Sequence, residues 1–220
     1  MKAYWHIDGP RKSPKSHCLA FDKLDGNNIR AEWHRKRGWS KFGTRTRLLD
    51  TTDPDFGIAI PLFMEKYSEP LVKVFKDEKH FYGVQEVIVY LELHGPNSFC
   101  GIHVPCETLT VTLIDVNPVK KGIVLPRDFI KMFGHLDIPH LIYEGNFGPK
   151  FVEDVRAGVY PVTFEGVVAK GILPGRKSDQ HALWFSKVKT NKWLDELRKR
   201  ATTDTRLVDV LRENVEEQSE

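Results

Sequence analysis

Short runs of β-branched and aromatic residues, each bounded by turn residues, constrain this chain more than any other feature of its sequence. Such runs are typical of β-strands, and tight turns between them join antiparallel neighbours. The predicted strands lie at 17–21, 28–34, 86–93, 108–116, 164–169 and 184–188. We therefore expect a chain built on antiparallel sheets.

Helical spacing of apolar residues is rarer and falls in a few places. Residues 56–75 show this spacing, although Pro61 and Pro70 are expected to limit the helix there to shorter pieces. Shorter helices are predicted at 127–133 and 149–157, and two amphipathic helices with an acidic tail at 191–220. The pattern predicts an α+β fold of antiparallel β-sheets with flanking helices over residues 1–190, followed by a helical C-terminal appendage.

The charge of the chain is informative only locally. Charged residues make up 29% of it and hydrophobic residues 40%, but the net charge of +3 indicates no particular partner. Residues 30–47 concentrate basic and aromatic side chains: Arg30, Arg35, Lys36, Arg37, Lys41, Arg45 and Arg47, with Trp33, Trp39 and Phe42. Such a mixture suits a phosphate backbone with exposed bases, or a solvated strand edge anchored by buried tryptophans.

The cysteines and the start of the chain indicate which cellular compartment to expect. Three cysteines in a chain without a leader-like start or a bilayer-length apolar stretch favour a reducing, cytoplasmic setting with no membrane. Cys100, His103 and Cys106 stand at ligand-like intervals, although a structural zinc needs four ligands. Ordinary core cysteines are the alternative interpretation.

Lys23 is the candidate nucleophile. It closes a predicted strand and precedes Asp25-Gly26, which places its amine beside a tight turn. A lysine attacks an electrophile only when its amine loses its proton, which burial or neighbouring cations favour. Taken alone, the same four residues are more typical of a surface β-hairpin turn than of a nucleophile.

Two carboxylates and two lysines lie in other predicted strands. Glu92 and Glu165 are each flanked by apolar strand residues, so each needs a cation, a metal or a hydroxyl partner. Lys187 and Lys189 alternate on one strand face, which suits a nucleotide phosphate and helps to keep a nearby lysine neutral. Buried salt bridges and a solvated strand edge are the alternatives.

In order and spacing these elements resemble the covalent nucleotidyltransferases, namely DNA ligases, RNA ligases and mRNA capping enzymes. The matching positions are Lys23 to Gly26, Arg45, Glu92, Asp115, Glu165-Gly166, and Lys187 to Lys189. The resemblance runs from about residue 17 to 190. It implies a nucleotidyltransferase domain with the ATP-grasp-like ligase fold.

The resemblance also implies a role for each matching residue. Lys23 would attack the α-phosphate of ATP and form a lysyl–AMP phosphoramidate. The AMP would then pass to an RNA 5′-phosphate and be displaced by a 3′-hydroxyl. The remaining nucleotide-binding residues would be Asp22, Asp25, Gly26, Asn28, Arg45, Glu92, Glu165, Lys187 and Lys189.

Within that set the implied contacts differ. The backbone of Asp22 would read the adenine edge, whereas Asn28 and Arg45 would hold the ribose or the RNA 5′-phosphate. Glu92 would hold the ribose hydroxyls, and Lys187 and Lys189 the α-phosphate. Glu165 would help to bind Mg²⁺ or Mn²⁺, hard ions that favour oxygen ligands.

Three positions distinguish members of the superfamily. Asn28 stands where RNA ligases of the nick-sealing, phage-like branch usually have Asn, and DNA ligases and capping enzymes Arg. Ile114 precedes Asp115 where the family usually has an aromatic residue that stacks on adenine. Both Arg45 and Arg47 fit the basic strand, and we choose Arg45 because it follows Gly43-Thr44.

The resemblance predicts an ATP-dependent RNA ligase, with two alternatives left open. One is a GMP-carrying capping guanylyltransferase, and the other is a catalytically silent nucleic-acid-binding module of the same fold. The stretch after Lys189 is too short for an OB-fold. The expectation is a minimal ligase that depends on a protein partner for RNA-end specificity or uses its closing helices for RNA contact.

Overall fold

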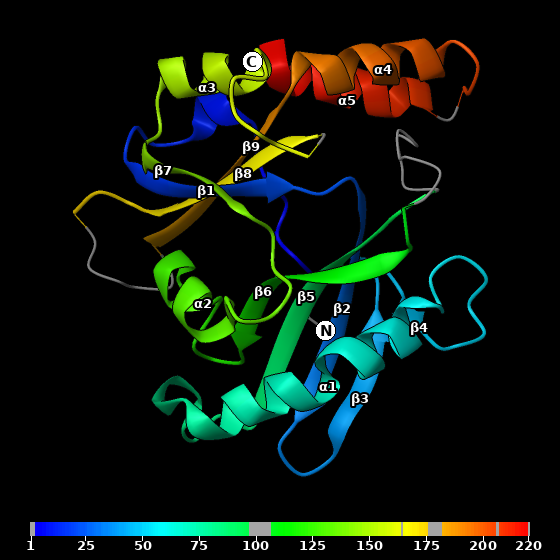
Figure 1. The fold of residues 1–220 in the computed structure, drawn as a ribbon, viewed down its shortest axis with the longest axis vertical. Coiled ribbons are helices and arrows are strands. Elements are labelled where there is room, and N and C mark those ends of the chain that lie inside the picture. The colour runs from blue at the N-terminus through cyan, green and yellow to red at the C-terminus, as the bar shows by residue number, and fades with distance from the viewer. Residues whose placement is uncertain (1–2, 97–106, 164, 176–181, 206, 220) are drawn as a thin grey trace. The chain divides into compact units, whose positions relative to one another are not determined.

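The chain folds into two compact units. The computed structural model describes residues 3–96, 107–163, 165–175, 182–205 and 207–219. The first unit comprises Met1–Trp5 and Gly26–Ile138, and the second comprises His6–Asp25 and Pro139–Glu220. Each unit is built around its own antiparallel sheet with helices (Figure 1). The predicted α+β architecture is confirmed.

The sheet of the first unit has five strands in the order β4-β3-β2-β5-β6. These are β2 (Gly26–His34), β3 (Gly38–Gly43), β4 (Leu48–Leu49), β5 (Glu86–His94) and β6 (Thr110–Pro118). The three longest strands, β2, β5 and β6, were predicted, and each predicted end lies within two residues of the observed one. Strands β3 and β4 were not predicted, because the first is short and rich in Gly, Ser and Lys and the second has only two residues. Pairing of β3 with β2, and of β4 with β3, supplies the stability that their composition lacks.

Helix α1 (Ala59–Asp77) is continuous, so the expectation that its two prolines limit it to shorter pieces is wrong. Pro61 lies in the first turn, where the missing N–H has no partner inside a helix anyway. Pro70 lies in the helix interior, at a cost of about 3 kcal/mol. Burial of one face, with Phe63 and Leu71 fully enclosed, offsets that cost.

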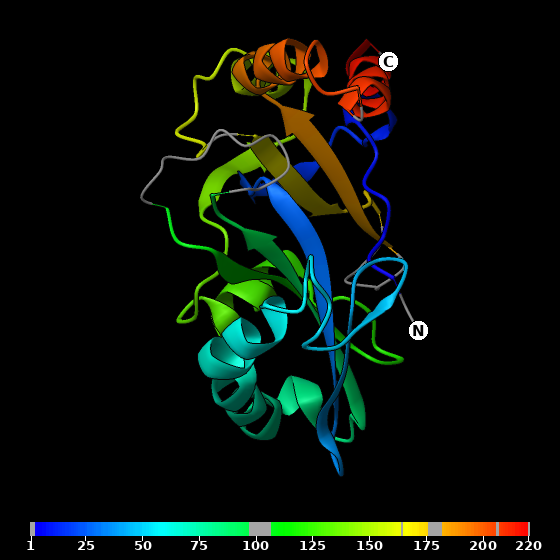
Figure 2. The same cartoon turned by 90° about the vertical axis from the view of Figure 1, so that its right-hand side faces the viewer.

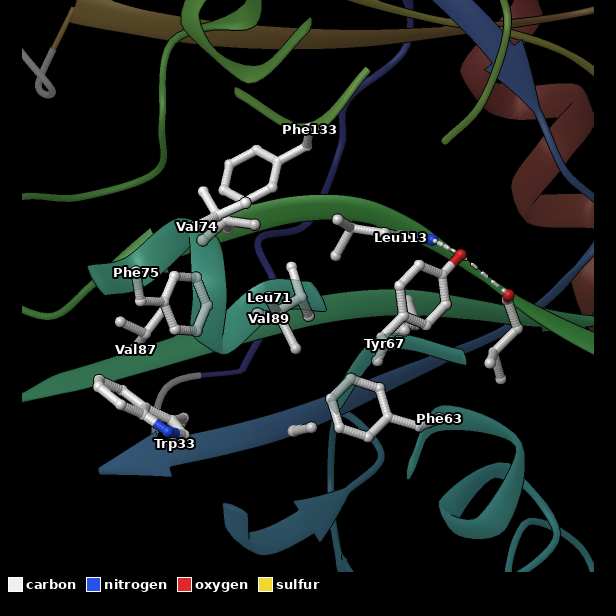
Figure 3. Packing of buried hydrophobic residues seen from close by; sticks show 14 of the residues in the cluster. Trp33, Phe63, Tyr67, Leu71, Val74, Phe75, Val87, Val89, Leu113 and Phe133 are labelled. Carbon is white, nitrogen blue, oxygen red and sulfur yellow. Dashed lines mark hydrogen bonds between the residues drawn. The ribbon is translucent and has the colours of Figure 1, made fainter. Parts of the chain in front are cut away.

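The core of the first unit lies between this sheet and its helices α1 and α2 (Pro126–Phe133). Aromatic rings dominate it, and the rings of Trp33 and Phe75 lie 5.3 Å apart (Figure 3). The Tyr67 hydroxyl accepts a hydrogen bond of 3.1 Å from the Leu113 amide, so the one polar atom on this helix face is satisfied.

The basic and aromatic segment 30–47 supplies this core. The ring of Trp39 packs 4.6 Å from Phe63, and its indole nitrogen donates to the Ser68 carbonyl at 3.1 Å. Phe42 also packs against Phe63, at 5.6 Å. These contacts leave both rings partly buried against the core, and Trp33 of the same segment is buried. The structure favours the interpretation of a strand edge anchored by aromatic residues.

The sheet of the second unit has four strands in the order β7-β1-β8-β9. These are β1 (His17–Lys23), β7 (Leu141–Asn146), β8 (Gly166–Ile172) and β9 (Leu183–Lys189). Strand β7 was not predicted, because it is a half-exposed edge strand that contains Gly145. The predicted strand at 164–169 begins instead at Gly166, and Phe164 lies outside the described residues.

Three helices belong to this unit: α3 (Pro149–Arg156), α4 (Asn191–Ala201) and α5 (Leu207–Ser219). All three were predicted. Helices α4 and α5 pack side by side, as both views show (Figures 1 and 2). Trp193, Leu194 and Leu197 of α4 are buried. Within the described ranges, no helix combines the length and the apolar character needed to cross a bilayer.

Candidate functional site

Two lysines share one buried carboxylate in the second unit. The Nζ atom of Lys23 lies 2.7 Å from Oε2 of Glu165, and Nζ of Lys189 lies 2.9 Å from Oε1 of the same residue. The Glu165 side chain is only 4% exposed, the Lys189 side chain 10% and the Lys23 side chain 21%. Lys23 therefore has the most exposed side chain of the cluster.

Strand register explains why these residues meet. Gly166 at the start of β8 pairs with Lys23 at the end of β1 and with Lys189 at the end of β9. Because β1 and β9 both run antiparallel to β8, their last residues flank the first residue of the central strand. Glu165 immediately precedes that residue, and its carboxylate lies between the two ammonium groups.

Gly166 is required at this point by its surroundings. Its φ is +148°, and a Cβ atom there would lie 2.0 Å from the Val188 carbonyl oxygen and 2.8 Å from the Lys189 Cα. Both neighbours are backbone atoms of β9, so neither can rotate away. The Glu-Gly pair noted in the sequence thus combines the carboxylate with the only residue type that lets β9 approach it.

We expect Gly166→Ala to lower the free energy of unfolding by well over the roughly 1–3 kcal/mol that an unfavourable φ alone costs. The additional loss comes from the clash with Val188. Urea unfolding measures it. Gly158→Ala is the matched control, because Gly158 has φ +74° but a Cβ added there would have nothing within 4 Å. Equal losses in the two variants would contradict this explanation.

The electrostatics of the cluster favour an ionised carboxylate. Burial alone would raise the pKa of Glu165, but the ammonium groups of Lys189 and Lys23 outweigh it and hold that pKa below its ordinary value. Burial lowers the pKa of Lys189; Glu165 opposes this effect, and the charges of Lys23 and Lys187 add to it. Both ammonium groups therefore interact with the same Glu165 carboxylate.

Asp22 and Asp25, which flank Lys23, are both buried. The Asp22 carboxylate accepts a 3.0 Å hydrogen bond from the Thr163 amide and another from the Thr163 hydroxyl, and the Asp22 amide donates to the His140 carbonyl at 2.8 Å. Asp22 thereby ties the segment before Glu165 to β1. Thr163 is a site residue that the sequence analysis missed, since nothing in its local sequence indicates this contact.

Lys187 and Lys170 lie on the same sheet. Lys187 is partly exposed, and its backbone amide donates to the Asp8 carbonyl at 3.0 Å. Lys170 lies within the sheet and not in the loop before β9. It belongs to β8, is buried, and its Nζ lies 5.1 Å from the Phe21 ring centroid and 5.6 Å from that of Phe185.

In the first unit, the register pairs Asn28 of β2 with Glu92 of β5. Both side chains are partly exposed, and the Asn28 amide donates to the Leu91 carbonyl at 3.3 Å. Gly26 starts the same strand, and a Cβ there would lie 2.3 Å from the Leu93 carbonyl oxygen. The glycine of the nucleophile turn thus permits close approach of β5.

The two arginines considered for the basic strand differ in their surroundings. Arg47 forms ion pairs with Asp53 at 3.0 Å and Asp55 at 3.2 Å. Arg45 is exposed and has no ion pair within the part of the chain that the structure describes. It lies in the turn between β3 and β4, so it is the arginine of the pair with a side chain available to a ligand.

Asp115 faces a tyrosine that the sequence analysis overlooked. The buried Tyr4 hydroxyl donates a hydrogen bond to the Asp115 carboxylate, and the rings of Tyr4 and Tyr90 lie 4.8 Å apart. Burial, followed by the charge of Asp115, raises the pKa of Tyr4. Ile114 is the extra residue at a bulge in β6 and is partly exposed, with no aromatic ring to offer a base.

A divalent cation has limited protein ligands here. Among the described residues, no three His, Cys, Asp or Glu side chains gather as a metal site. Mg²⁺ commonly takes one or two carboxylates together with substrate phosphates and water. Glu165 can supply that single carboxylate, so the residues fit an ion that arrives with a triphosphate. Cys100, His103 and Cys106, the alternative zinc ligands, lie outside the described residues, as do Arg176 and Lys177.

Comparison with solved structures identifies the fold. It is that of the nucleotidyltransferase domain of ATP-dependent RNA and DNA ligases. A mutant Naegleria gruberi RNA ligase with AMP and Mn is 11% identical, with a TM-score of 0.57 over 83% of this chain and 52% of its own. A protein of Aquifex aeolicus, assigned by name as an ATP-dependent DNA ligase, is 13% identical, with a TM-score of 0.66 over 100% of this chain and 58% of its own.

A second mutant of the Naegleria enzyme, without ligand, is 12% identical, with a TM-score of 0.61 over 88% of this chain and 58% of its own. This chain thus spans little more than half the length of these proteins. The sequence matches no protein-family model and none of the curated proteins compared with it. At these identities the likeness concerns the fold.

Proposed function

We propose that this chain is an ATP-dependent nucleotidyltransferase of the polynucleotide-ligase kind that carries AMP on Lys23 and seals RNA ends. Residues 1–190 would form its adenylylation domain, with 191–220 as the C-terminal helices. The observation that carries the proposal is the Lys23–Glu165–Lys189 cluster, in which one buried carboxylate bridges two amines. The ligase fold around it supports the same conclusion.

The first step is attack of the Lys23 amine on the α-phosphate of ATP. The ammonium group first gives one proton to solvent; the nitrogen then forms a bond to phosphorus, the bond to the pyrophosphate oxygen breaks with its electron pair remaining on pyrophosphate, and a second proton passes to solvent. Lys23 and Lys189 share the Glu165 carboxylate, so their repulsion is relieved when one of the two amines becomes neutral. Lys189, which remains charged, would stabilise the negative charge that builds up on the phosphate oxygens.

Glu165 would orient Lys23 at first and exchange that partner when the amine is deprotonated for attack. The neutral amine no longer carries the charge that holds it on Oε2, and this oxygen becomes available to a metal ion that arrives with ATP. Mg²⁺ or Mn²⁺ held there would neutralise phosphate charge. Positioning and electrostatics therefore provide most of the catalysis, as is general in phosphoryl transfer.

The remaining steps join RNA. The AMP would pass from Lys23 to an RNA 5′-phosphate, and a 3′-hydroxyl would displace it to form the phosphodiester. The roles of Asn28, Arg45 and Glu92 in holding nucleotide and RNA, and of the Asp22 backbone and Lys187, are proposed from the motif match. Asn28 favours RNA over DNA because RNA ligases of this kind usually have Asn at that position.

Incubation with labelled ATP or GTP, each with Mg²⁺, tests the proposal. We expect a covalent adduct with ATP, and its label should transfer to an RNA strand bearing a 5′-phosphate at a nick. A GMP adduct would favour the capping guanylyltransferase instead. No adduct with either nucleotide would favour a silent nucleic-acid-binding module.

A further inference from the structure

A tryptophan on α4 contacts the lysine that shares the carboxylate with Lys23. The Nζ atom of Lys189 lies 3.9 Å from the centroid of the Trp193 ring, close enough for a strong cation–π interaction. The Trp193 side chain is buried, with 1% of the residue exposed. The ammonium group of Lys189 therefore lies between an aromatic face and the Glu165 carboxylate.

Backbone hydrogen bonds also link α4 to Glu165. Thr190 caps α4, and its hydroxyl oxygen accepts a 3.1 Å hydrogen bond from the Trp193 amide. The Thr190 amide in turn donates to the Glu165 carbonyl at 2.9 Å. Glu165, Lys189, Thr190 and Trp193 thus form a closed ring of contacts. The first turn of α4 therefore contacts the residues of the site directly.

We propose that Trp193 is a positioning residue for nucleotidyl transfer, which holds the Lys189 ammonium against Glu165 and thereby fixes the carboxylate that orients Lys23. The inference rests on the proposed function, since the reaction it serves is the adenylylation of Lys23. Trp193 is placed too deep to touch substrate, so it acts through Lys189.

Three variants separate positioning from packing. Trp193→Leu removes the aromatic face, Trp193→Phe keeps one, and Leu197→Ala truncates another buried residue of α4, about one turn beyond Trp193. The rate of adduct formation at saturating ATP is measured for each, together with thermal unfolding. A fluorinated tryptophan at position 193, which weakens the attraction of the ring face for a cation at nearly constant size, serves if Trp193→Leu does not fold.

We expect Trp193→Leu to slow adduct formation about tenfold or more, in line with loss of a desolvated cation–π contact. Trp193→Phe should recover most of the rate, and Leu197→Ala should keep the wild-type rate despite a lower melting temperature. Fluorination should reduce the rate in the order of electron withdrawal.

Two results would overturn the inference while leaving the proposed function intact. One is a wild-type rate in Trp193→Leu or in the fluorinated protein. The other is an equal loss in Leu197→Ala, which would make Trp193 a packing residue only. A wild-type protein that forms no adduct would instead overturn the proposed function, and this inference with it.

Discussion

Lys23→Ala is expected to abolish the covalent nucleotide adduct while the chain keeps its fold. No other amine can replace Lys23 in the proposal, because Lys189 is buried between Glu165 and the Trp193 ring. The fold should persist because Glu165 keeps Lys189 as its counter-ion at 2.9 Å. Adduct formation is measured by intact mass, and the fold by circular dichroism and thermal unfolding.

Lys23→Arg is the matched control for this prediction. Arginine keeps a positive charge beside Glu165 but remains protonated, so it cannot act as a nucleophile. It should bind nucleotide and form no adduct. Lys12→Ala, which removes an exposed lysine of the same unit paired with Asp8 at 3.4 Å, should leave the adduct unchanged. An adduct that survives Lys23→Ala would show that another residue is the nucleophile.

Glu165→Gln is expected to lower the free energy of unfolding by about 3–5 kcal/mol and to reduce adenylylation severely. The amide cannot balance the two ammonium groups, of which that of Lys189 is buried. Adenylylation suffers because Lys23 loses its 2.7 Å partner and the metal its carboxylate. Urea unfolding and the rate of adduct formation at limiting Mg²⁺ measure the two effects.

The acid stability of the chain follows from the same residue. The pKa of Glu165 lies below its value of about 4.3 in an unfolded chain, so its contribution to stability is complete above that value. The contribution is lost as pH falls through the lower, folded-state pKa. Unfolding free energies measured from pH 7 downward should therefore decline in acid, and Glu165→Gln should lack this part of the decline.

Glu144→Gln provides the control for both effects. Glu144 lies 3.6 Å from His17 in a pair whose side chains are both more than a third exposed, so its loss should change stability by less than about 1 kcal/mol. A Glu165→Gln variant as stable and as active as Glu144→Gln would contradict the roles given to the buried carboxylate.

The pattern of β-branched and aromatic runs bounded by turns was sufficient to predict the long strands, because β2, β5 and β6 each bury one face against α1 and α2. It failed for β3 and β7, where pairing with a neighbouring strand outweighs weak local propensity. It also failed for Pro70, since the local cost of a proline is visible in the sequence whereas the burial that offsets it is not.

In the candidate site, too, some residues could be predicted from the sequence and others could not. Motif spacing led to Lys23, Glu165 and Lys189, and strand register brings these three together. The contacts around them come from residues without a local signal: Thr163 donates hydrogen bonds to Asp22, and Trp193, on a helix that was predicted, contacts Lys189. Long-range partners of this kind depend on how strands and helices close around the site.

Mass spectrometry of the intact protein after incubation with ATP and Mg²⁺, followed by peptide mapping, tests the central claim most directly. We predict the added mass of one AMP, located on the peptide that carries Lys23. Unmodified protein under these conditions, or AMP located on any other residue, would contradict the assignment of the Lys23 amine as the nucleotide carrier.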